Sequence, residues 1–261
     1  MVPKFAANLT MLFNEFDFLD RFEAAARAGF KAVEFLFPYA FDKRSIKERL
    51  DANGLELVLH NLPAGDWTAG ERGIACLPDR VEEFRSGIAL AIEYASALGC
   101  PRLNCLSGLA PNNVDSEIVS RTFIDNLRFA ARLLEQSGIP LLTEPINTED
   151  VPNFHLSRTQ QAVDILRKVE SKNLKIQYDI YHMQIMEGNL AFTIKQNLGN
   201  IGHIQIADNP GRNEPGTGEI NFTFLFDYLD SIGYQSWIGC EYKPKTGTVN
   251  GLKWRQALST N

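Results

Sequence analysis

Three acidic residues and one glutamine lie at or near the ends of short apolar runs in the second half of the chain. These runs are 139–144, 174–179, 203–206 and 237–241, and the residues are Glu144, Asp179, Gln205 and Glu241. Such runs predict buried strands, so a charged residue at the end of one requires an explanation. Three carboxylates brought to one place repel one another and resist ionisation unless a cation lies between them. Oxygen ligands of this kind suit Mg²⁺ or Mn²⁺ better than Zn²⁺, so the pattern predicts a divalent metal site.

Each of these acids, taken alone, has an ordinary alternative role as a helix cap or as the partner of a surface lysine. The four residues together favour a shared site, because neighbouring parallel strands deliver them at matching positions. His182 follows three residues after Asp179, where it could hydrogen-bond a substrate oxygen or act as an acid. His60 ends an earlier apolar run and is a second candidate. Either histidine could instead be satisfied by neighbouring backbone groups.

Three cationic residues fall near the same strand ends. Lys243 follows the last of the acidic residues, whereas Arg212 and Arg72 lie in long loops that come after apolar runs. Beside a metal they would suit an anionic small molecule, since arginine grips a carboxylate with two hydrogen bonds. The alternative for each is a solvated surface cation. The candidate substrate-binding residues are therefore His182, Lys243, Arg212, His60 and Arg72.

The elements that must position these residues are eight apolar runs separated by segments with helical spacing. The expected strands are 4–9, 32–37, 55–60, 102–106, 140–144, 174–179, 203–207 and 236–241. Strand and helix alternating eight times requires crossover connections and hence parallel strands. In a chain of this length that favours a single (β/α)8 TIM barrel with its active site at the C-terminal rim of the strands. An open doubly wound sheet is the alternative, but no GxGxxG motif follows the first run.

Local signals mark helix ends and loops. Gly29, Gly99, Gly138 and Gly233 each follow a helical segment, and Ser157 with Gln160 predicts a capping box. Two long loops, 61–78 and 208–221, come after strand ends. The segment 214–219 could close as a lid or lie as a shaped wall, and it lacks the GxxxxGK[ST] order, so we expect no nucleotide cofactor. No linker divides the chain, which predicts one domain over 1–261.

The composition limits the classes of partner. The chain has 261 residues and a formal net charge of −6, which disfavours nucleic acid or an anionic membrane as the main partner. No apolar stretch approaches the roughly 20 residues that span a bilayer, and the run 5–13 lacks a signal-peptide cleavage site. The four cysteines show no metal or disulfide spacing, so we expect reduced thiols and a cytoplasmic protein. An aromatic content of 10% is compatible with a homo-oligomer.

Several longer blocks carry a family resemblance that runs from FAANLTMLF near the N-terminus to GLKW near the C-terminus. They are HNLPAGDWTAGERGIACLP, EPIN, IQYDIYHMQ, HIQIADNPGRNEPGTGEIN and GCEYKP. These blocks resemble the hydroxypyruvate isomerase family within the wider xylose-isomerase-like group of barrels. The resemblance implies a barrel that interconverts hydroxypyruvate and 2-hydroxy-3-oxopropanoate (tartronate semialdehyde). The block HNLPAGDW looks like the hydroxypyruvate members rather than their sister group, which acts on 2-oxo-tetronate.

The resemblance also implies roles for individual residues. Glu144 and Glu241 match the proton-transfer pair, and His182 matches a histidine that contacts the substrate. The metal positions match Glu144, Asp179, Gln205 and Glu241. Where many relatives place a histidine on strand seven, this chain has Gln205, whose neutral amide is a weaker ligand.

These residues suggest a mechanism. Moving the carbonyl between neighbouring carbons requires a proton to leave C3 and another to arrive at C2 through an enediolate, which a divalent ion stabilises. One glutamate takes the proton and the other returns it, and the sequence leaves open which does which. Three other functions stay open: a sugar or sugar-acid epimerase, a metal-dependent endonuclease and a non-catalytic binding protein for small acids.

Overall fold

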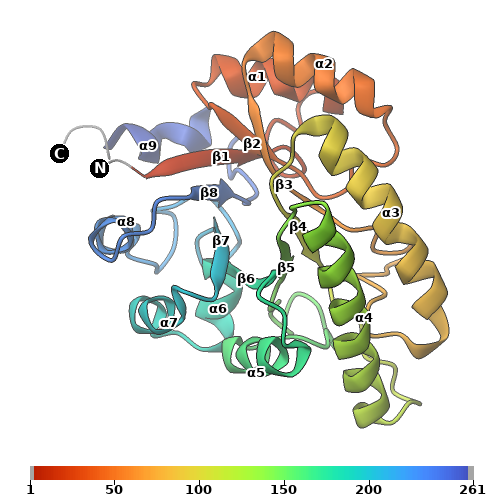
Figure 1. The fold of residues 1–261 in the computed structure, drawn as a ribbon. Helices are drawn as coiled ribbons and strands as arrows, with labels where there is room; N and C mark the ends of the chain where they lie inside the picture. Colours follow the sequence, from red (N-terminus) through yellow and green to blue (C-terminus); the bar gives the residue numbers. More distant parts are fainter. Residues whose placement is uncertain (1–2, 258–261) are drawn as a thin grey trace.

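The computed structural model describes residues 3–257 and forms a closed barrel of eight parallel strands (Figure 1). The strands are β1 (Lys4–Asn8), β2 (Ala32–Glu34), β3 (Glu56–Asn61), β4 (Leu103–Cys105), β5 (Leu141–Thr143), β6 (Leu174–Asp179), β7 (Ile201–Ile206) and β8 (Trp237–Cys240). Each strand pairs with the next in sequence, and β1 pairs with β8. The predicted (β/α)8 barrel is therefore confirmed, and the alternative of an open doubly wound sheet is wrong.

Helices surround this barrel (Figure 1). They are α1 (Arg21–Arg27), α2 (Lys43–Asn53), α3 (Val81–Leu98), α4 (Ser116–Gln136), α5 (Thr159–Val169), α6 (Ile180–Met186), α7 (Leu190–Asn197), α8 (Phe222–Ser231) and α9 (Lys253–Ala257), with short 3₁₀ turns η1 (Phe18–Asp20), η2 (Pro78–Arg80) and η3 (Asn250–Leu252). The predicted helix-terminating glycines, Gly29, Gly99, Gly138 and Gly233, all have positive φ as expected. None of the described helices is long and apolar enough to cross a membrane.

The predicted capping box at Ser157 and Gln160 is wrong. Helix α5 begins at Thr159, whose backbone N–H donates to the Glu187 side chain at 2.7 Å. The Gln160 amide donates to Asp164 one turn later in the helix instead of reaching back. A carboxylate from a distant part of the chain thus caps this helix, which a local motif cannot reveal.

The core has two parts. A large apolar layer lies between the strands and the helices, and it includes the four cysteines, which are buried and free as predicted. Inside the barrel, a small apolar cluster forms from Ala6, Ala32, Val58, Leu59 and Leu142. Further along the strands the buried interior becomes polar, with Asn8, Glu34 and Gln205. The sequence therefore closes one end of the barrel with small apolar side chains and fills the other with hydrogen-bonding groups.

Gly239 on β8 is required by this polar interior. A Cβ atom at this position would overlap the carboxylate of Glu34, which is fully buried. The same carboxylate accepts hydrogen bonds from Asn8 at 2.9 Å and from Gln205 at 2.7 Å. Because partners on other strands hold Glu34, it cannot move aside cheaply.

We therefore expect Gly239→Ala to lower the free energy of unfolding by about 1–3 kcal/mol, the usual cost of overpacking a core. Gly199→Ala is the matched control, because a Cβ atom at that position meets no atom within 4 Å. Urea denaturation followed by circular dichroism compares the two variants. Equal stability of Gly239→Ala and Gly199→Ala would show that the Glu34 carboxylate can be displaced without cost.

Candidate active site

A cavity of about 610 Å³ opens at the C-terminal end of the barrel. The segments that follow all eight strands contribute to its wall, and one residue from each is Met11, Leu36, Arg72, Leu106, Glu144, His182, Arg212 and Glu241. Lys243 also lines the cavity. The volume is within the range of small-molecule binding pockets. Six of the predicted site residues, Glu144, Glu241, His182, Arg212, Arg72 and Lys243, therefore line one cavity.

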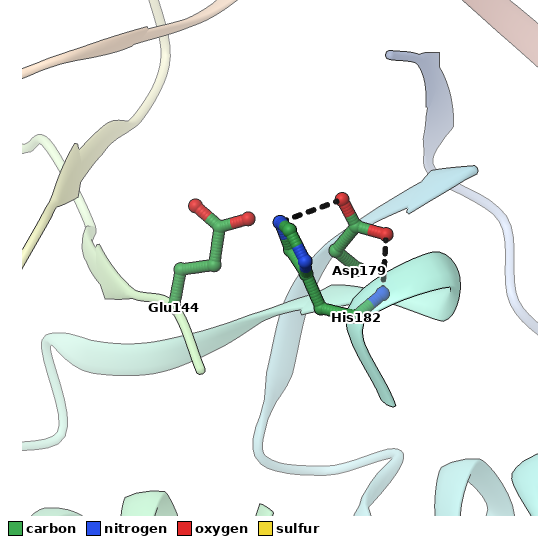
Figure 2. A group of neighbouring side chains, drawn as sticks. All are labelled: Glu144, Asp179 and His182. Atoms are coloured by element: carbon green, nitrogen blue, oxygen red, sulfur yellow. Dashed lines mark hydrogen bonds and ion pairs between the residues drawn. The ribbon is translucent and has the colours of Figure 1, made fainter. Parts of the chain in front are cut away.

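An acidic cluster lies at the base of this cavity. Glu144 directly follows β5, Asp179 ends β6, and His182 lies in the first turn of α6. One ligand atom from each of these residues lies within 4.8 Å of the others. Figure 2 shows the imidazole of His182 between the two carboxylates. The cluster brings together residues that are 38 positions apart along the chain (182 − 144).

Asp179 serves the fold and the cavity with different oxygens. Its Oδ1 accepts from the backbone N–H groups of Tyr181 at 2.7 Å and His182 at 3.3 Å, and so caps α6. Its Oδ2 is buried and has no hydrogen-bond partner. Two side-chain nitrogens, His182 Nε2 and Arg212 Nη2, are each 3.6 Å from that oxygen. A buried carboxylate oxygen in this state is an available ligand for a cation.

Glu241 directly follows β8 and is held from two sides. Arg212 Nη2 donates to its Oε2 at 2.7 Å, and Asn8 Nδ2 donates to its Oε1 at 3.1 Å. Arg212 has a φ of +55°, an uncommon conformation for a residue with a Cβ atom. Glu144 has a neutral partner instead, since Asn104 Nδ2 donates to its Oε2 at 3.0 Å. The two predicted proton-transfer residues therefore have different surroundings.

Burial shifts the pKa of each of these groups in the direction that favours its uncharged form. Desolvation raises the pKa of Glu241 to about 8, against the opposing effect of Arg212. Desolvation and the nearby charges of Glu241 and Asp179 raise the pKa of Glu144 well above its usual value. The pKa of Asp179 is raised mainly by burial. Burial and the charge of Arg212 hold the pKa of His182 well below its usual value, so this imidazole is neutral near pH 7.

The donor set fits a divalent cation. Glu144 and Asp179 can supply carboxylate oxygens, which hard divalent ions prefer, and Glu241 lines the same cavity as Glu144. The Oδ2 of Asp179 gives such an ion a buried ligand atom that accepts no hydrogen bond. Gln205 is further inside the barrel, where its Oε1 accepts from Gln177 at 2.6 Å and its Nε2 donates to Glu34 at 2.7 Å. An amide oxygen has two lone pairs, so Gln205 keeps one for a cation.

The remaining predicted residues take different positions. The Arg72 guanidinium stacks on Trp67, 4.2 Å from the ring centroid, at the cavity wall. Lys243 is exposed at the mouth. His60 is fully buried beside Tyr39 and Phe35 and is not among the described residues that line the cavity. Its contact with substrate stays a prediction.

Sequence reasoning missed a buried polar layer beneath the cavity. Glu34 joins Asn8, Gln205 and His203, whose Nε2 lies 2.7 Å from the Glu34 carboxylate. Glu34 also ends a strand, so it carries the signal that identified the other acids. The longer apolar run 32–37 hid that signal, because β2 ends at Glu34 rather than three residues later.

The 208–221 loop is a shaped wall that Asp208 holds together. This buried carboxylate accepts from the backbone N–H groups of Gly216 at 2.8 Å, Gly218 at 2.9 Å and Ile220 at 3.1 Å. A backbone hydrogen bond from Lys243 to Arg212, at 2.7 Å, joins the loop to the segment after β8. The loop thereby places Arg212 over the acidic cluster.

We expect Asp208→Ala to speed amide exchange in the segment 209–221 by at least about tenfold. A hydrogen bond to a charged acceptor is worth about 1.5–3 kcal/mol, and the variant removes four of them, from the backbone N–H groups of Asn209, Gly216, Gly218 and Ile220. Hydrogen–deuterium exchange followed by mass spectrometry measures this rate. Glu219→Gln is the control, because the Glu219 carboxylate accepts from the side chains of Asn209 and Gln184. Unchanged exchange in Asp208→Ala would contradict this role.

His60 generates a prediction about stability. Burial lowers its pKa from 6.5 to about 4. Between these two pH values His60 is therefore mostly protonated in the unfolded chain and mostly neutral in the folded chain. The contribution of His60 to the free energy of unfolding is fully present above about pH 6.5. It is lost as the pH falls toward 4, by up to about 3 kcal/mol. Urea denaturation at pH 7 and pH 4.5 should show a smaller loss in His60→Gln than in the parent chain. An identical pH dependence in both proteins would exclude this contribution.

The chain is similar to several known proteins over nearly its whole length. A family model described as a xylose isomerase-like TIM barrel matches residues 22–258. Hydroxypyruvate isomerase of Escherichia coli is 57% identical over 96% of this chain and 97% of that protein. A 2-oxo-tetronate isomerase of Cupriavidus necator is 49% identical, covering 97% of each chain. A Brucella melitensis crystal structure described as an AP endonuclease, family 2, has a TM-score of 0.95 and 45% identity, covering 98% of each chain.

Proposed function

We propose that this chain, which belongs to the xylose isomerase-like TIM-barrel family, is an isomerase that interconverts hydroxypyruvate and 2-hydroxy-3-oxopropanoate. The observation that carries the proposal is the pair Glu144 and Glu241, two buried carboxyl groups in one cavity that arginine and lysine side chains also line. The 57% identity to a hydroxypyruvate isomerase over nearly the whole chain supports it.

The two glutamates suit proton transfer at carbon. A catalytic carboxyl group works best when its pKa lies near the working pH, and burial raises the pKa of both, to about 8 for Glu241. Asn8 and Arg212 orient the Glu241 carboxylate, and Asn104 orients that of Glu144. One glutamate takes the proton from C3 and the other delivers a proton to C2. The hydroxyl proton of the C3 oxygen passes to the C2 oxygen, so the carbonyl moves by one carbon with no net change in atoms.

A divalent cation belongs to this proposal as Mg²⁺ or Mn²⁺, held by Glu144, Asp179, Gln205 and Glu241. When bound, such an ion supplies positive charge against the oxyanion that forms as the proton leaves. The protein contributes the remaining contacts. His182, Arg212 and Lys243 line the cavity, where they can bind the oxygens and the carboxylate of a small acid. Arg72 adds a further cationic side chain to the cavity wall.

A four-carbon substrate is the second candidate function. The relative from Cupriavidus necator, at 49% identity, is a 2-oxo-tetronate isomerase. The cavity of about 610 Å³ leaves room for another carbon beyond the acidic cluster. Assaying both acids with the same preparation separates the two functions by their kcat/KM values.

DNA cleavage is disfavoured despite the name of the similar Brucella melitensis structure. Proteins that track DNA neutralise its phosphates with clustered lysine and arginine. This chain carries a net charge of −6. At the cavity, Arg212 is already paired with Glu241 and Asp179.

We expect Glu144→Gln and Glu241→Gln each to reduce turnover of hydroxypyruvate by at least about 10³-fold while the protein stays folded. Glutamine keeps the shape but cannot take the proton, and general acid–base catalysis is worth about 10²–10⁴-fold. NMR in deuterated water reports both isomerisation and exchange of substrate C–H protons. Full activity in a folded Glu241→Gln protein would contradict the proposal.

Two controls sharpen this experiment. Glu117→Gln changes an exposed glutamate in the first turn of α4 that is not among the described residues lining the cavity, and it should retain activity. Treatment with a chelator should abolish turnover, and added Mg²⁺ or Mn²⁺ should restore it. Undiminished turnover after chelation would remove the metal from the proposal and leave the glutamate pair in place.

A further inference from the structure

We propose that Asn147 is a positioning residue that holds His182 with its ring proton on Nε2, so that the imidazole donates a hydrogen bond to a substrate oxygen. Asn147 follows β5 in the same segment as Glu144 and is fully buried. Its Nδ2 lies 2.7 Å from His182 Nδ1. The part of the proposal that concerns the substrate rests on the proposed function, whereas the position of the ring proton does not.

The orientation of the Asn147 amide follows from its partners. Its Oδ1 accepts from the backbone N–H groups of Glu149 at 3.1 Å and Asp150 at 2.7 Å. Its Nδ2 donates to the Asp150 carboxylate at 3.0 Å, which leaves the second Nδ2 hydrogen for His182. An asparagine side chain offers two lone pairs and two hydrogens, so all four positions are used.

The reversed amide would be strongly disfavoured. It would direct its oxygen at the Asp150 carboxylate and its NH₂ group at two backbone N–H donors, which replaces three favourable contacts by repulsive ones. Asp150 is itself held, since Tyr181 donates to its Oδ2 at 2.9 Å. The atom that faces His182 Nδ1 is therefore a donor.

This donor decides the state of the imidazole. A neutral histidine carries one proton, so an Nδ1 atom that accepts a hydrogen bond leaves the proton on Nε2. Nε2 lies on the side of the ring that faces the cluster, 3.6 Å from Asp179 Oδ2 (Figure 2). A protonated Nε2 cannot ligate a cation and can donate to an oxygen. The geometry thus separates His182, as a donor to substrate, from the carboxylates, as ligands of a metal.

Long-range ¹H–¹⁵N spectra of the full chain, recorded with Mg²⁺, test this directly, because protonated and unprotonated ring nitrogens resonate in separate regions. The chain has four histidines, and His182→Gln identifies the His182 signals by their loss. We expect an unprotonated Nδ1 and a protonated Nε2 in the parent chain. In Asn147→Asp, whose carboxylate can only accept, the pattern should reverse. A protonated Nδ1 in the parent chain would overturn the proposal, even if the variant failed to fold.

Kinetics supply the second readout. Asn147→Asp should lower kcat/KM for hydroxypyruvate about 10- to 100-fold, the usual effect of removing a group that orients a site residue. In a His182→Gln background the same substitution should cost nothing further, because the residue it positions is gone. Independent, multiplicative losses would contradict a role through His182.

Asn126→Asp is the matched control, because Asn126 is a buried asparagine outside the cavity whose Nδ2 donates to the Ala75 carbonyl at 2.9 Å. It should leave the His182 spectrum unchanged. A chain with the expected spectrum but no turnover of hydroxypyruvate would refute the proposed function and keep the role of Asn147 in fixing the ring proton.

Discussion

The concentration of buried negative charge inside one end of the barrel is the constraint on which the rest of the structure depends. Glu34, Glu144, Asp179 and Glu241 are all buried there. An unpaired carboxylate excluded from water is costly, so each must be neutralised, protonated or bound by donors. Arg212 lies beside Asp179 and Glu241, and His203 lies beside Glu34. The side-chain amides of Asn8, Asn104 and Gln205 donate hydrogen bonds to Glu241, Glu144 and Glu34, respectively.

Much of the surrounding architecture follows from that constraint. Arg212 reaches the cluster only because the 208–221 loop is folded over it, and this loop is organised by the Asp208 carboxylate. Arg212 keeps its uncommon backbone conformation while its carbonyl accepts a hydrogen bond from the backbone N–H of Lys243. We propose that these buried charged groups are kept, in place of apolar side chains, for the proton transfer proposed at the site.

The sequence predicted the scaffold and the rim acids well, for a physical reason. A strand that is buried on both faces is a nearly continuous apolar run, so an acid at its end, such as Glu144 or Asp179, stands out against it. Contacts made across space could not be predicted in this way. The pairing of Arg212 with Glu241 depends on the fold of a long loop, and Glu187 caps α5 from 28 positions away (187 − 159). His60 shows the converse, since the end of a strand does not decide which face its side chain occupies.

The contact between Glu34 and Gly239 has a consequence for how such barrels diverge. The two residues lie on β2 and β8, on either side of β1, and the carboxylate fills the space that a side chain at position 239 would need. A residue with a side chain cannot replace Gly239 while Glu34 stays as it is. Across related sequences the two should vary as a pair, with a larger residue at 239 accompanied by a shorter or uncharged one at 34. The residues found at positions 34 and 239 would then show which lineages kept the acidic side chain beneath the cavity and which replaced it.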